Sequence, residues 1–296
     1  ERASDIRQTV LSPRLTLSYK LSEYLRLRGG YARGFRAPQA FNEDLHIANV
    51  GGEPQFVILS EDLKTEYSNA YTASLNYSRS KDLLQLDLLL EGFYTALKDP
   101  FTQVSTGAVL PNGSILEEVR NGSGARVYGT NFEVGVSPDL QWQFQLGGTL
   151  QRSRYDEPQL LFESDGTPGE SDVVIDEFVR VPNLYGYLNA SWIPGEAFNV
   201  DLTGTYTGQM TVPRVISESG FLELNEVNPF FDLNIKLESH IDFSEEFMAT
   251  FSVGVKNLFN SYQDDFEVGP TRDSNYIYGP AAPRTYFFGV KFGKLH

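Results

Sequence analysis

Histidine is the first residue type to consider for chemistry, because an imidazole can act as a general base or bind a metal. The three histidines, His46, His240 and His296, lie far apart along the 296 residues. The Gly-x-Ser-x-Gly motif, which exposes a serine nucleophile on a sharp turn, does not occur. The chain also has no cysteine, which excludes thiolate nucleophiles and thiolate metal sites. These residues predict no catalytic site, and we do not expect an enzyme.

The acidic residues near the C-terminus form a second candidate group, since Ca²⁺ prefers carboxylate oxygens. Asp264, Asp265, Glu267 and Asp273 are close in sequence, but they lack the Asp-x-Asp-x-Asp-Gly spacing of a calcium loop. A solvated acidic loop is therefore the expected structure, and we predict neither a metal nor a cofactor. The formal net charge of -15 also disfavours nucleic acid as a partner, because phosphate binding requires clusters of Lys and Arg.

The elements that would position side chains are clearest in residues 84–94. Every second residue from Leu84 to Leu90 is leucine, and the intervening residues include Gln85 and Asp87. A period of two indicates a β-strand with one apolar and one polar face. A similar run over residues 71–78 precedes it across a turn at residues 80–82, which predicts a hairpin. Each arm has about 12 residues, more than the mean of about 5–6 for strands and enough for a transmembrane strand of about 9–11.

The same alternation recurs in about eleven segments along the chain. Short turns alternate with five long connections, at residues 34–65, 99–123, 155–181, 209–228 and 259–279. Outer-membrane barrels have this pattern, with short periplasmic turns and long extracellular loops. Trp142 follows one short turn and Trp192 precedes another, so both are expected at one rim in an aromatic girdle. The predicted fold is all-β, an antiparallel transmembrane β-barrel built as an up-and-down meander of about eleven strands.

The apolar faces of these strands are expected to form one outward band against outer-membrane lipid. The band comprises Leu84, Leu86, Leu88, Leu90, Phe132, Val134, Phe144, Leu202, Leu233, Ile235, Phe251 and Val253. A soluble β-sandwich or β-helix is the alternative, but strand length and the alternation of connections favour the membrane. Because single-chain bacterial barrels have even strand numbers and free edges are costly in lipid, an odd count suggests part of a larger barrel.

Two carboxylates stand within the expected strands. Glu91 lies on the polar face with Asp87, and Glu133 lies on the polar face with Asn131. A charge facing lipid at mid-membrane costs on the order of 2–4 kcal/mol for Arg or Lys, and somewhat less for Glu. Both carboxylates are therefore expected to project into the lumen from neighbouring strands. The residues themselves leave open whether they are hydrated there or paired with a cation.

Several stretches of the chain resemble TonB-dependent outer-membrane receptors. Residues 31–46 contain Gly-Phe-Arg-Ala-Pro, which in that family marks a strand leaving the membrane for an extracellular loop. Residues 62–68, 93–100, 128–133 and 180–183 resemble further strand and loop boundaries, and Val-Lys-Asn-Leu-Phe-Asn at 255–260 is the most specific motif. Their order and spacing are similar to the C-terminal half of the family's 22-stranded barrel. The family's plug and TonB-box are absent from these residues, and four residues follow Phe292, where the family often ends on an aromatic residue.

The resemblance implies that residues 1–296 are the C-terminal portion of a receptor barrel in the bacterial outer membrane. Such a receptor imports a scarce, bulky solute, such as an iron-siderophore, haem, cobalamin or a glycan, with energy that the TonB complex delivers through the plug. In the family, barrel carboxylates pair with arginines of the plug. The resemblance therefore makes Glu91 and Glu133 candidates for the plug-facing lumen, together with Arg26 and Arg28 on the polar face of an earlier strand.

The long connections carry the candidates for contact with a small-molecule ligand, which are Arg36, Phe41, His46 and Phe101. Aromatic rings suit a hydrophobic or planar ligand. A solvated loop histidine and loops that pack on themselves are the alternatives. Two other functions stay open, a passive porin-like channel and a soluble all-β binding module; a plug encoded upstream would favour the receptor.

Overall fold

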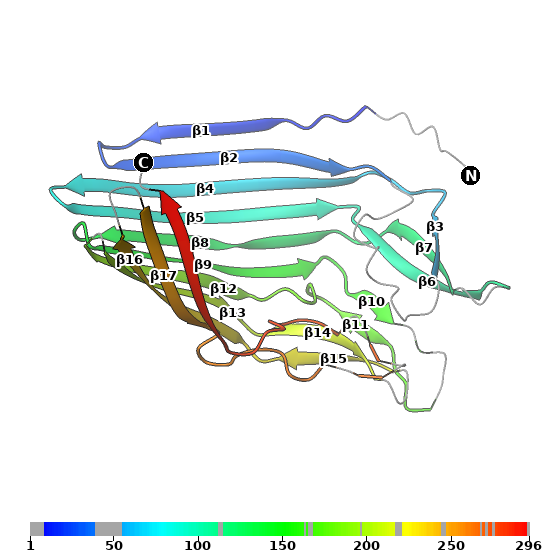
Figure 1. Ribbon diagram of the computed structural model, residues 1–296. Coiled ribbons are helices and arrows are strands. Elements are labelled where there is room, and N and C mark those ends of the chain that lie inside the picture. Colours follow the sequence, from blue (N-terminus) through cyan, green and yellow to red (C-terminus); the bar gives the residue numbers. More distant parts are fainter. Residues whose placement is uncertain are drawn as a thin grey trace.

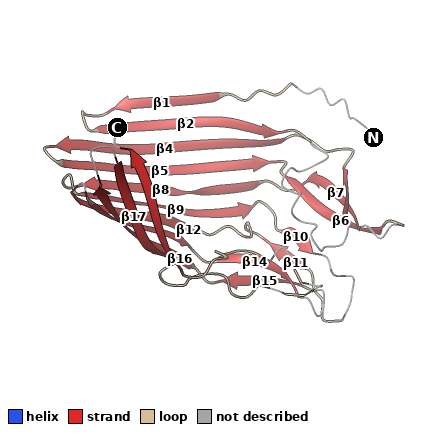
Figure 2. Ribbon diagram, in the orientation of Figure 1, coloured by secondary structure: helices blue, strands red, loops and turns tan. Residues whose placement is uncertain are grey.

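The computed structural model describes residues 9–38, 55–111, 115–162, 164, 168–195, 197–216, 221–243, 247–266, 268–269, 272–273 and 276–294. The regular structure of these residues consists of β-strands (Figure 2). Among them there is no helix of the length and hydropathy that crossing a membrane requires. The all-β fold class predicted from the sequence is confirmed.

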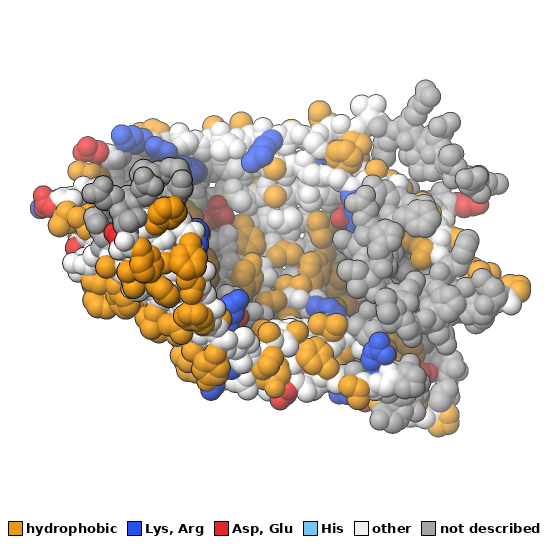
Figure 3. Space-filling view, in the orientation of Figure 1, with side chains coloured by type: hydrophobic (Ala, Val, Ile, Leu, Met, Phe, Trp, Pro, Cys, Tyr) orange, Lys and Arg blue, Asp and Glu red, His pale blue; other side chains and the backbone are white. Residues whose placement is uncertain are grey.

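Eleven long strands form a single antiparallel sheet (Figure 1). They are β1 (Arg14–Lys20), β2 (Leu25–Arg36), β4 (Glu66–Lys81), β5 (Leu84–Lys98), β8 (Ala125–Ser137), β9 (Trp142–Tyr155), β12 (Leu184–Gly195), β13 (Phe198–Thr207), β16 (Phe230–Asp242), β17 (Phe247–Lys256) and β18 (Thr285–Lys294). Each pairs with the next in this order, so the predicted meander of eleven strands is confirmed. The sheet curves like part of a cylinder wall, with β16–β18 opposite β1–β5 across a hollow (Figures 1 and 3).

Seven shorter strands lie in four of the long connections, where the sequence analysis assigned none. They are β3 (Gln55–Leu59), β6 (Phe101–Val109), β7 (Ile115–Asn121), β10 (Gln159–Phe162), β11 (Val173–Ile175), β14 (Met210–Val215) and β15 (Leu222–Val227). They form three small sheets, and β3 pairs with β7 in parallel although they belong to different connections. The described parts of these connections therefore contain regular structure, and Figure 1 shows the short strands gathered at one end of the large sheet.

The strand register decides which face each side chain takes. It aligns Leu86, Val136, Phe144, Ala190 and Leu202 in one row and continues to Ile235, so the predicted apolar band occupies a single face. Leu90 and Val253 of this band are 55% and 50% exposed. In Figure 3 apolar side chains cover the outer face of β16–β18, whereas the hollow shows mainly white atoms with scattered apolar and charged side chains. Exposure of so much apolar surface outside the hollow is the arrangement that lipid stabilises.

The aromatic rim is also in the predicted place. Trp142 and Trp192 are directly opposite each other in the pairing of β9 with β12, and their ring centroids are 5.6 Å apart. Phe144 stacks on Trp142, and Phe198 meets Trp192 edge-on. These rings lie beside the short turns, where amphipathic indoles suit the boundary between lipid and water.

Candidate functional site in the lumen and the loops

The four lumen candidates lie on one face of the sheet, opposite the apolar band. One row across neighbouring strands contains Arg28, Ser74, Glu91, Asn131 and Thr149. With strands about 4.8 Å apart, the backbones of Arg28 and Glu91 are about 10 Å apart, separated by one strand. The two residues therefore share a surface, and no ion pair of the described residues joins them.

The adjacent row on this face has Arg26 of β2 opposite Asn76 of β4 and Leu89 of β5 opposite Glu133 of β8. Because β5 pairs directly with β8, Glu91 and Glu133 lie on neighbouring strands, as the sequence predicted. The structure thus brings all four candidates to the polar face. Their role toward a plug stays a prediction.

Both carboxylates accept hydrogen bonds from neutral side chains. The amide of Asn131 donates to Glu91 Oε1 at 3.0 Å, and the Thr149 hydroxyl donates to Asn131 Oδ1 at 2.8 Å. The hydroxyl of Tyr187 donates to Glu133 Oε1 at 3.3 Å. No ion pair of the described residues includes Glu91 or Glu133. Their negative charge is therefore oriented by the sheet but not neutralised by it.

A second group of carboxylates on this face is neutralised within the sheet. The Lys236 ammonium lies 3.1 Å from Glu238 and 3.8 Å from Asp201. Asn199 donates its amide to Asp201 at 3.1 Å, and the Ser191 hydroxyl donates to Asp201 at 2.7 Å. In contrast to Asp201 and Glu238, Glu91 and Glu133 therefore have capacity for an external cation.

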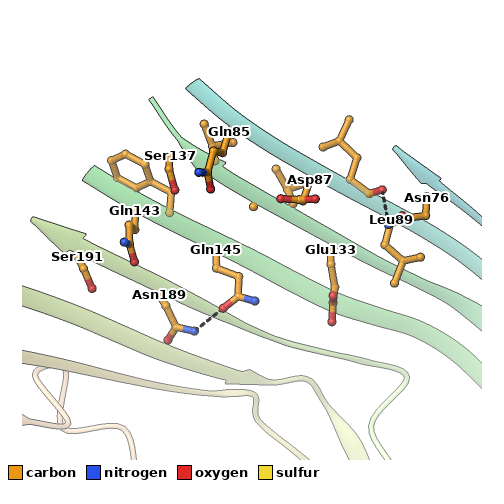
Figure 4. A pocket seen from close by; sticks show the side chains of 15 residues that line it. Asn76, Gln85, Asp87, Leu89, Glu133, Ser137, Gln143, Gln145, Asn189 and Ser191 are labelled. Carbon is orange, nitrogen blue, oxygen red and sulfur yellow. Dashed lines mark hydrogen bonds between the residues drawn. The ribbon is translucent and has the colours of Figure 1, made fainter. Parts of the chain in front are cut away.

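A cavity of about 450 Å³ lies between these residues and the short turns. Residues of β4, β5, β8, β9 and β12 line it. Figure 4 shows polar side chains directed into it, among them Asp87, Glu133, Gln143, Gln145 and Asn189. Asn189 donates to the Gln145 carbonyl at 3.3 Å. Amides and carboxylates of this kind suit water or the polar surface of another domain, and the described residues of the wall include no histidine.

Two of the four loop candidates are described by the structure. Arg36 at the end of β2 lies over the ring of Phe101 in β6, with 5.3 Å between guanidinium carbon and ring centroid. The Phe101 amide donates to Glu66 Oε2 at 3.1 Å. Arg36 and Phe101 therefore pack on each other, as the alternative of self-packing loops anticipated. Phe41 and His46 lie outside the described residues.

The sequence analysis missed a residue that organises the last long connection, Gln263, which is 1% exposed. Its amide donates to the carbonyl of Tyr276 at 3.0 Å. Its carbonyl accepts from the backbone N–H groups of Tyr278 at 2.9 Å and Gly279 at 3.3 Å. We call Gln263 with these three partners the Gln263 lock. A glutamine in a polar loop gives no sequence signal for this role, because its partners lie 13–16 residues away.

Tyr276, one partner in the Gln263 lock, also packs against the β14–β15 hairpin. Tyr276, Met210, Val212 and Val227 form a buried apolar cluster with Val212 fully enclosed. Arg180 spans the same region, since its guanidinium donates to the carbonyl of Ile277 at 2.9 Å. Partial burial lowers the pKa of Arg180, and nearby Asp273 and Tyr276 oppose that shift. The ends of β9, β12, β13 and β16 that lead into the long connections are thus capped by a packed unit.

Asp265, considered above as a cation ligand, binds tyrosines in this unit. It accepts hydrogen bonds from the hydroxyls of Tyr276 at 3.0 Å and Tyr278 at 2.8 Å. Burial, followed by the hydrogen bond to Asp265, raises the pKa of Tyr278 well above its ordinary value. The described residues contain no group of three His, Cys, Asp or Glu that could hold a metal ion. The two hydrogen bonds of the Asp265 carboxylate link Tyr276 and Tyr278 within this unit.

The fold is shared with known proteins. The family model described as TonB dependent receptor-like, beta-barrel, matches residues 2–258. Among solved structures, the ferric enterobactin receptor PfeA of Pseudomonas aeruginosa is 18% identical with a TM-score of 0.61, covering 96% of this chain and 40% of that one. The siderophore receptor PirA of Acinetobacter baumannii is 18% identical with a TM-score of 0.60, covering 96% and 41%. The FrpB iron transporter of Neisseria meningitidis is 12% identical with a TM-score of 0.62, covering 96% and 39%.

No curated protein matches the chain. The chain spans about two fifths of the length of these solved receptors, and their likeness shows a common fold. The match of the family model over most of the chain shows the family itself and its place in the bacterial outer membrane. A family of receptors also gives no support to an enzymatic activity. The chain belongs to the TonB-dependent receptors and forms eleven consecutive strands of their β-barrel.

Proposed function

We propose that residues 1–296 are the C-terminal part of the barrel of a receptor that imports a ferric siderophore with energy from the TonB complex. The observation that carries the proposal is the family match over residues 2–258. Two solved proteins of similar fold are described as a ferric enterobactin receptor and a siderophore receptor. Haem, cobalamin and glycans are the other solutes considered for this chain.

The lumen face supports coupling between the barrel wall and a plug. Arg26, Arg28, Glu91 and Glu133 share two adjacent rows, and the two carboxylates have no cationic partner among the described residues. A plug that presents cations to the carboxylates and anions to the arginines would be held in one orientation. Charge-assisted hydrogen bonds of this kind contribute about 1.5–3 kcal/mol each, so a few of them restrain a domain without fixing it permanently.

The loop unit supports capture of a bulky ligand at the outer end. The three small sheets and the Gln263 lock join the described parts of the extracellular segments to one another. Arg36 and Phe101, with Phe41 and His46 from the same connections, are the proposed ligand contacts. Ordered loops lower the conformational entropy that a ligand has to remove on binding.

The test is uptake of radioactive iron by cells that carry the full-length receptor as their sole ferric-siderophore receptor. Catecholate and hydroxamate complexes, haem and cobalamin are supplied separately, in strains with and without TonB. Uptake of a ferric siderophore that requires TonB supports the proposal. TonB-independent uptake of unrelated small solutes would instead identify a passive channel, and TonB-dependent uptake of only haem or cobalamin would correct the ligand.

A further inference from the structure

Five cations lie on the outward face of β2–β9, at the strand ends that lead into the long connections. The register places Arg33 of β2, Arg126 of β8 and Arg154 of β9 in one row. Arg152 lies one row nearer the apolar band, and Lys98 lies one row further from it. We call these five residues the basic belt. In a chain with a formal net charge of -15, they form a local positive surface.

A row of tyrosines borders the basic belt on the side of the apolar band. Tyr31, Tyr71, Tyr94 and Tyr128 are successive partners across β2, β4, β5 and β8, and Arg152 of β9 ends the row. The ring centroids of Tyr31 and Tyr71 are 5.1 Å apart, and those of Tyr71 and Tyr94 are 6.4 Å apart. Tyrosines in such a row are typical of the interface between lipid and water.

The distance between this row and the tryptophan rim matches the thickness of the apolar band. Arg152 is ten positions beyond Trp142 on β9. With about 3.4 Å per residue and a strand tilt of about 40°, these positions are about 26 Å apart along the barrel axis. The outward apolar band of such barrels is about 25 Å tall between its aromatic girdles. The basic belt therefore lies at the level of the lipid head groups.

The basic belt retains capacity for an anion. Arg152 and Lys98 take part in no ion pair of the described residues. The Arg33 guanidinium lies 4.3 Å from the ring centroid of Tyr67, and its buried Nε has no hydrogen-bond acceptor. Arg126 and Arg154 pair with carboxylates at 3.9 and 3.8 Å, and all four side chains are about half exposed. Exposed ion pairs of this length are weak, so a phosphate can replace the carboxylate.

The positive surface is confined to one sector of the described wall. The outward positions of β12, β13, β16 and β17, from Leu184 and Phe198 to Phe231 and Val255, carry no Lys or Arg. A general attraction to charged lipid would need no such sector. The grouping on β2–β9 instead indicates a defined occupant.

We propose that the basic belt binds the phosphates of one lipopolysaccharide molecule in the outer leaflet. The long connections of such barrels are extracellular, so the belt faces that leaflet, where a phosphorylated glycolipid supplies both acyl chains and anionic groups. Arginine suits phosphate because its planar fork donates two parallel hydrogen bonds. Arg33 and Arg126 are three strands apart, about 14 Å, with Asn69 and Ala96 between them, which leaves room for sugar rings between two phosphates.

The acyl chains of this lipid would lie over the tyrosine row and the apolar band below it. The site is on the outside of the barrel, so it is separate from the lumen and from capture of a solute. Its failure would leave the proposed uptake function untouched.

The test measures lipid A binding to the delipidated full-length receptor in detergent by native mass spectrometry. Bisphosphorylated and dephosphorylated lipid A with the same acyl chains are titrated separately. Replacing both Lys98 and Arg152 by glutamine should weaken binding of the bisphosphorylated form about 10- to 30-fold, and each single substitution about fivefold, as expected for cations near a charged lipid surface. Binding of the dephosphorylated form should not respond to these substitutions.

Arg79→Gln with Lys81→Gln is the matched control. Both residues face outward on β4, opposite Leu86 and Leu84, but lie at the short-turn end of the strand. The control removes the same charge from the other rim and should leave affinity for lipid A unchanged. Heat-modifiable migration of each variant verifies that its barrel is folded.

Four results would overturn the proposal. They are equal affinity for the two forms of lipid A, unchanged affinity in the Lys98 and Arg152 double variant, an equal loss in the control, and equal affinity for phosphatidylglycerol. The last result would identify a general anion site. Displacement of bound lipid A by millimolar inorganic phosphate would lead to the same conclusion.

Discussion

Replacing Gln263 by leucine tests whether one buried amide holds the extracellular unit together. Leucine keeps most of the side-chain volume and apolar contact but removes three hydrogen bonds to the backbone of Tyr276, Tyr278 and Gly279. Because Gln263 is 1% exposed, water cannot readily replace those bonds. A net contribution of about 0.5–1.5 kcal/mol per hydrogen bond gives a local destabilisation of about 2–4 kcal/mol.

The assay is amide hydrogen exchange of the full-length receptor, followed at peptides that cover residues 276–280. A loss of about 2–4 kcal/mol in the free energy of local opening increases the local exchange rate by a factor of about 30 to 1,000 where local opening governs the rate. Peptides from the centres of β5 and β9 should retain their protection, because the lock contacts no residue there. Gln141→Leu is the control, since Gln141 is exposed and its amide is 3.5 Å from the Pro194 carbonyl.

Unchanged exchange at residues 276–280 in Gln263→Leu would refute the reasoning, because it would mean that the apolar cluster and Arg180 suffice to hold the loop. Loss of protection throughout the barrel would refute it differently, by showing that the loop unit and the sheet unfold together. The expected result lies between these two, with opening confined to the loops.

Three further predictions concern the lumen carboxylates, the effect of pH on the last loop, and the hydrogen bonds of Asn121. Replacing both Glu91 and Glu133 by glutamine in the full-length receptor should leave barrel assembly intact, since neither side chain belongs to the lipid-facing band. The double substitution should weaken plug retention and lower TonB-dependent uptake. Normal uptake with unchanged thermal release of the plug would reject the coupling role. The raised pKa of Tyr278 means that its contribution to loop stability is complete below the unfolded tyrosine pKa of about 10 and is lost as pH rises beyond that value. The rate of proteolysis of the loop should therefore increase at high pH in the native receptor, and Tyr278→Phe should remove that pH dependence. An equal increase of the proteolysis rate with pH in both proteins would contradict the prediction. Asn121→Ala removes hydrogen bonds to the backbone of Lys64 and Asp99 and should lower the free energy of local opening there by about 1–3 kcal/mol. Hydrogen exchange at residues 62–66 measures this change, and exchange in β8 should stay the same.

The local sequence pattern was enough to predict the long strands and their faces. Side chains alternate across a strand, so the leucines at every second position from Leu84 to Leu90 already identify one apolar face. The same alternation placed Glu91 and Glu133 opposite that face, and the turn positions placed Trp142 and Trp192 at one rim. These predictions depend only on neighbours in sequence, which is why they agree with the structure.

Positions that depend on register or on distant partners could not be predicted. The row that joins Arg28 to Glu91 requires the pairing of β2 with β4 and of β4 with β5. The parallel pairing of β3 with β7 joins two separate connections, and their short strands carry too few residues for a clear period. Phe41 and His46 lie outside the described residues, so the proposed ligand contacts on their connection stay predictions.

The sequence by itself determined the fold class, the lipid-facing and lumen-facing sets, and the family. Only the tertiary structure decided that Gln263 is buried among backbone groups, and that Arg33, Arg126 and Arg154 share one row on the outer surface. The physical reason is the range of the interactions. Alternation along a strand is set by the covalent geometry of adjacent residues, whereas a buried amide or a row of cations across several strands exists only when segments far apart in the chain are brought into register.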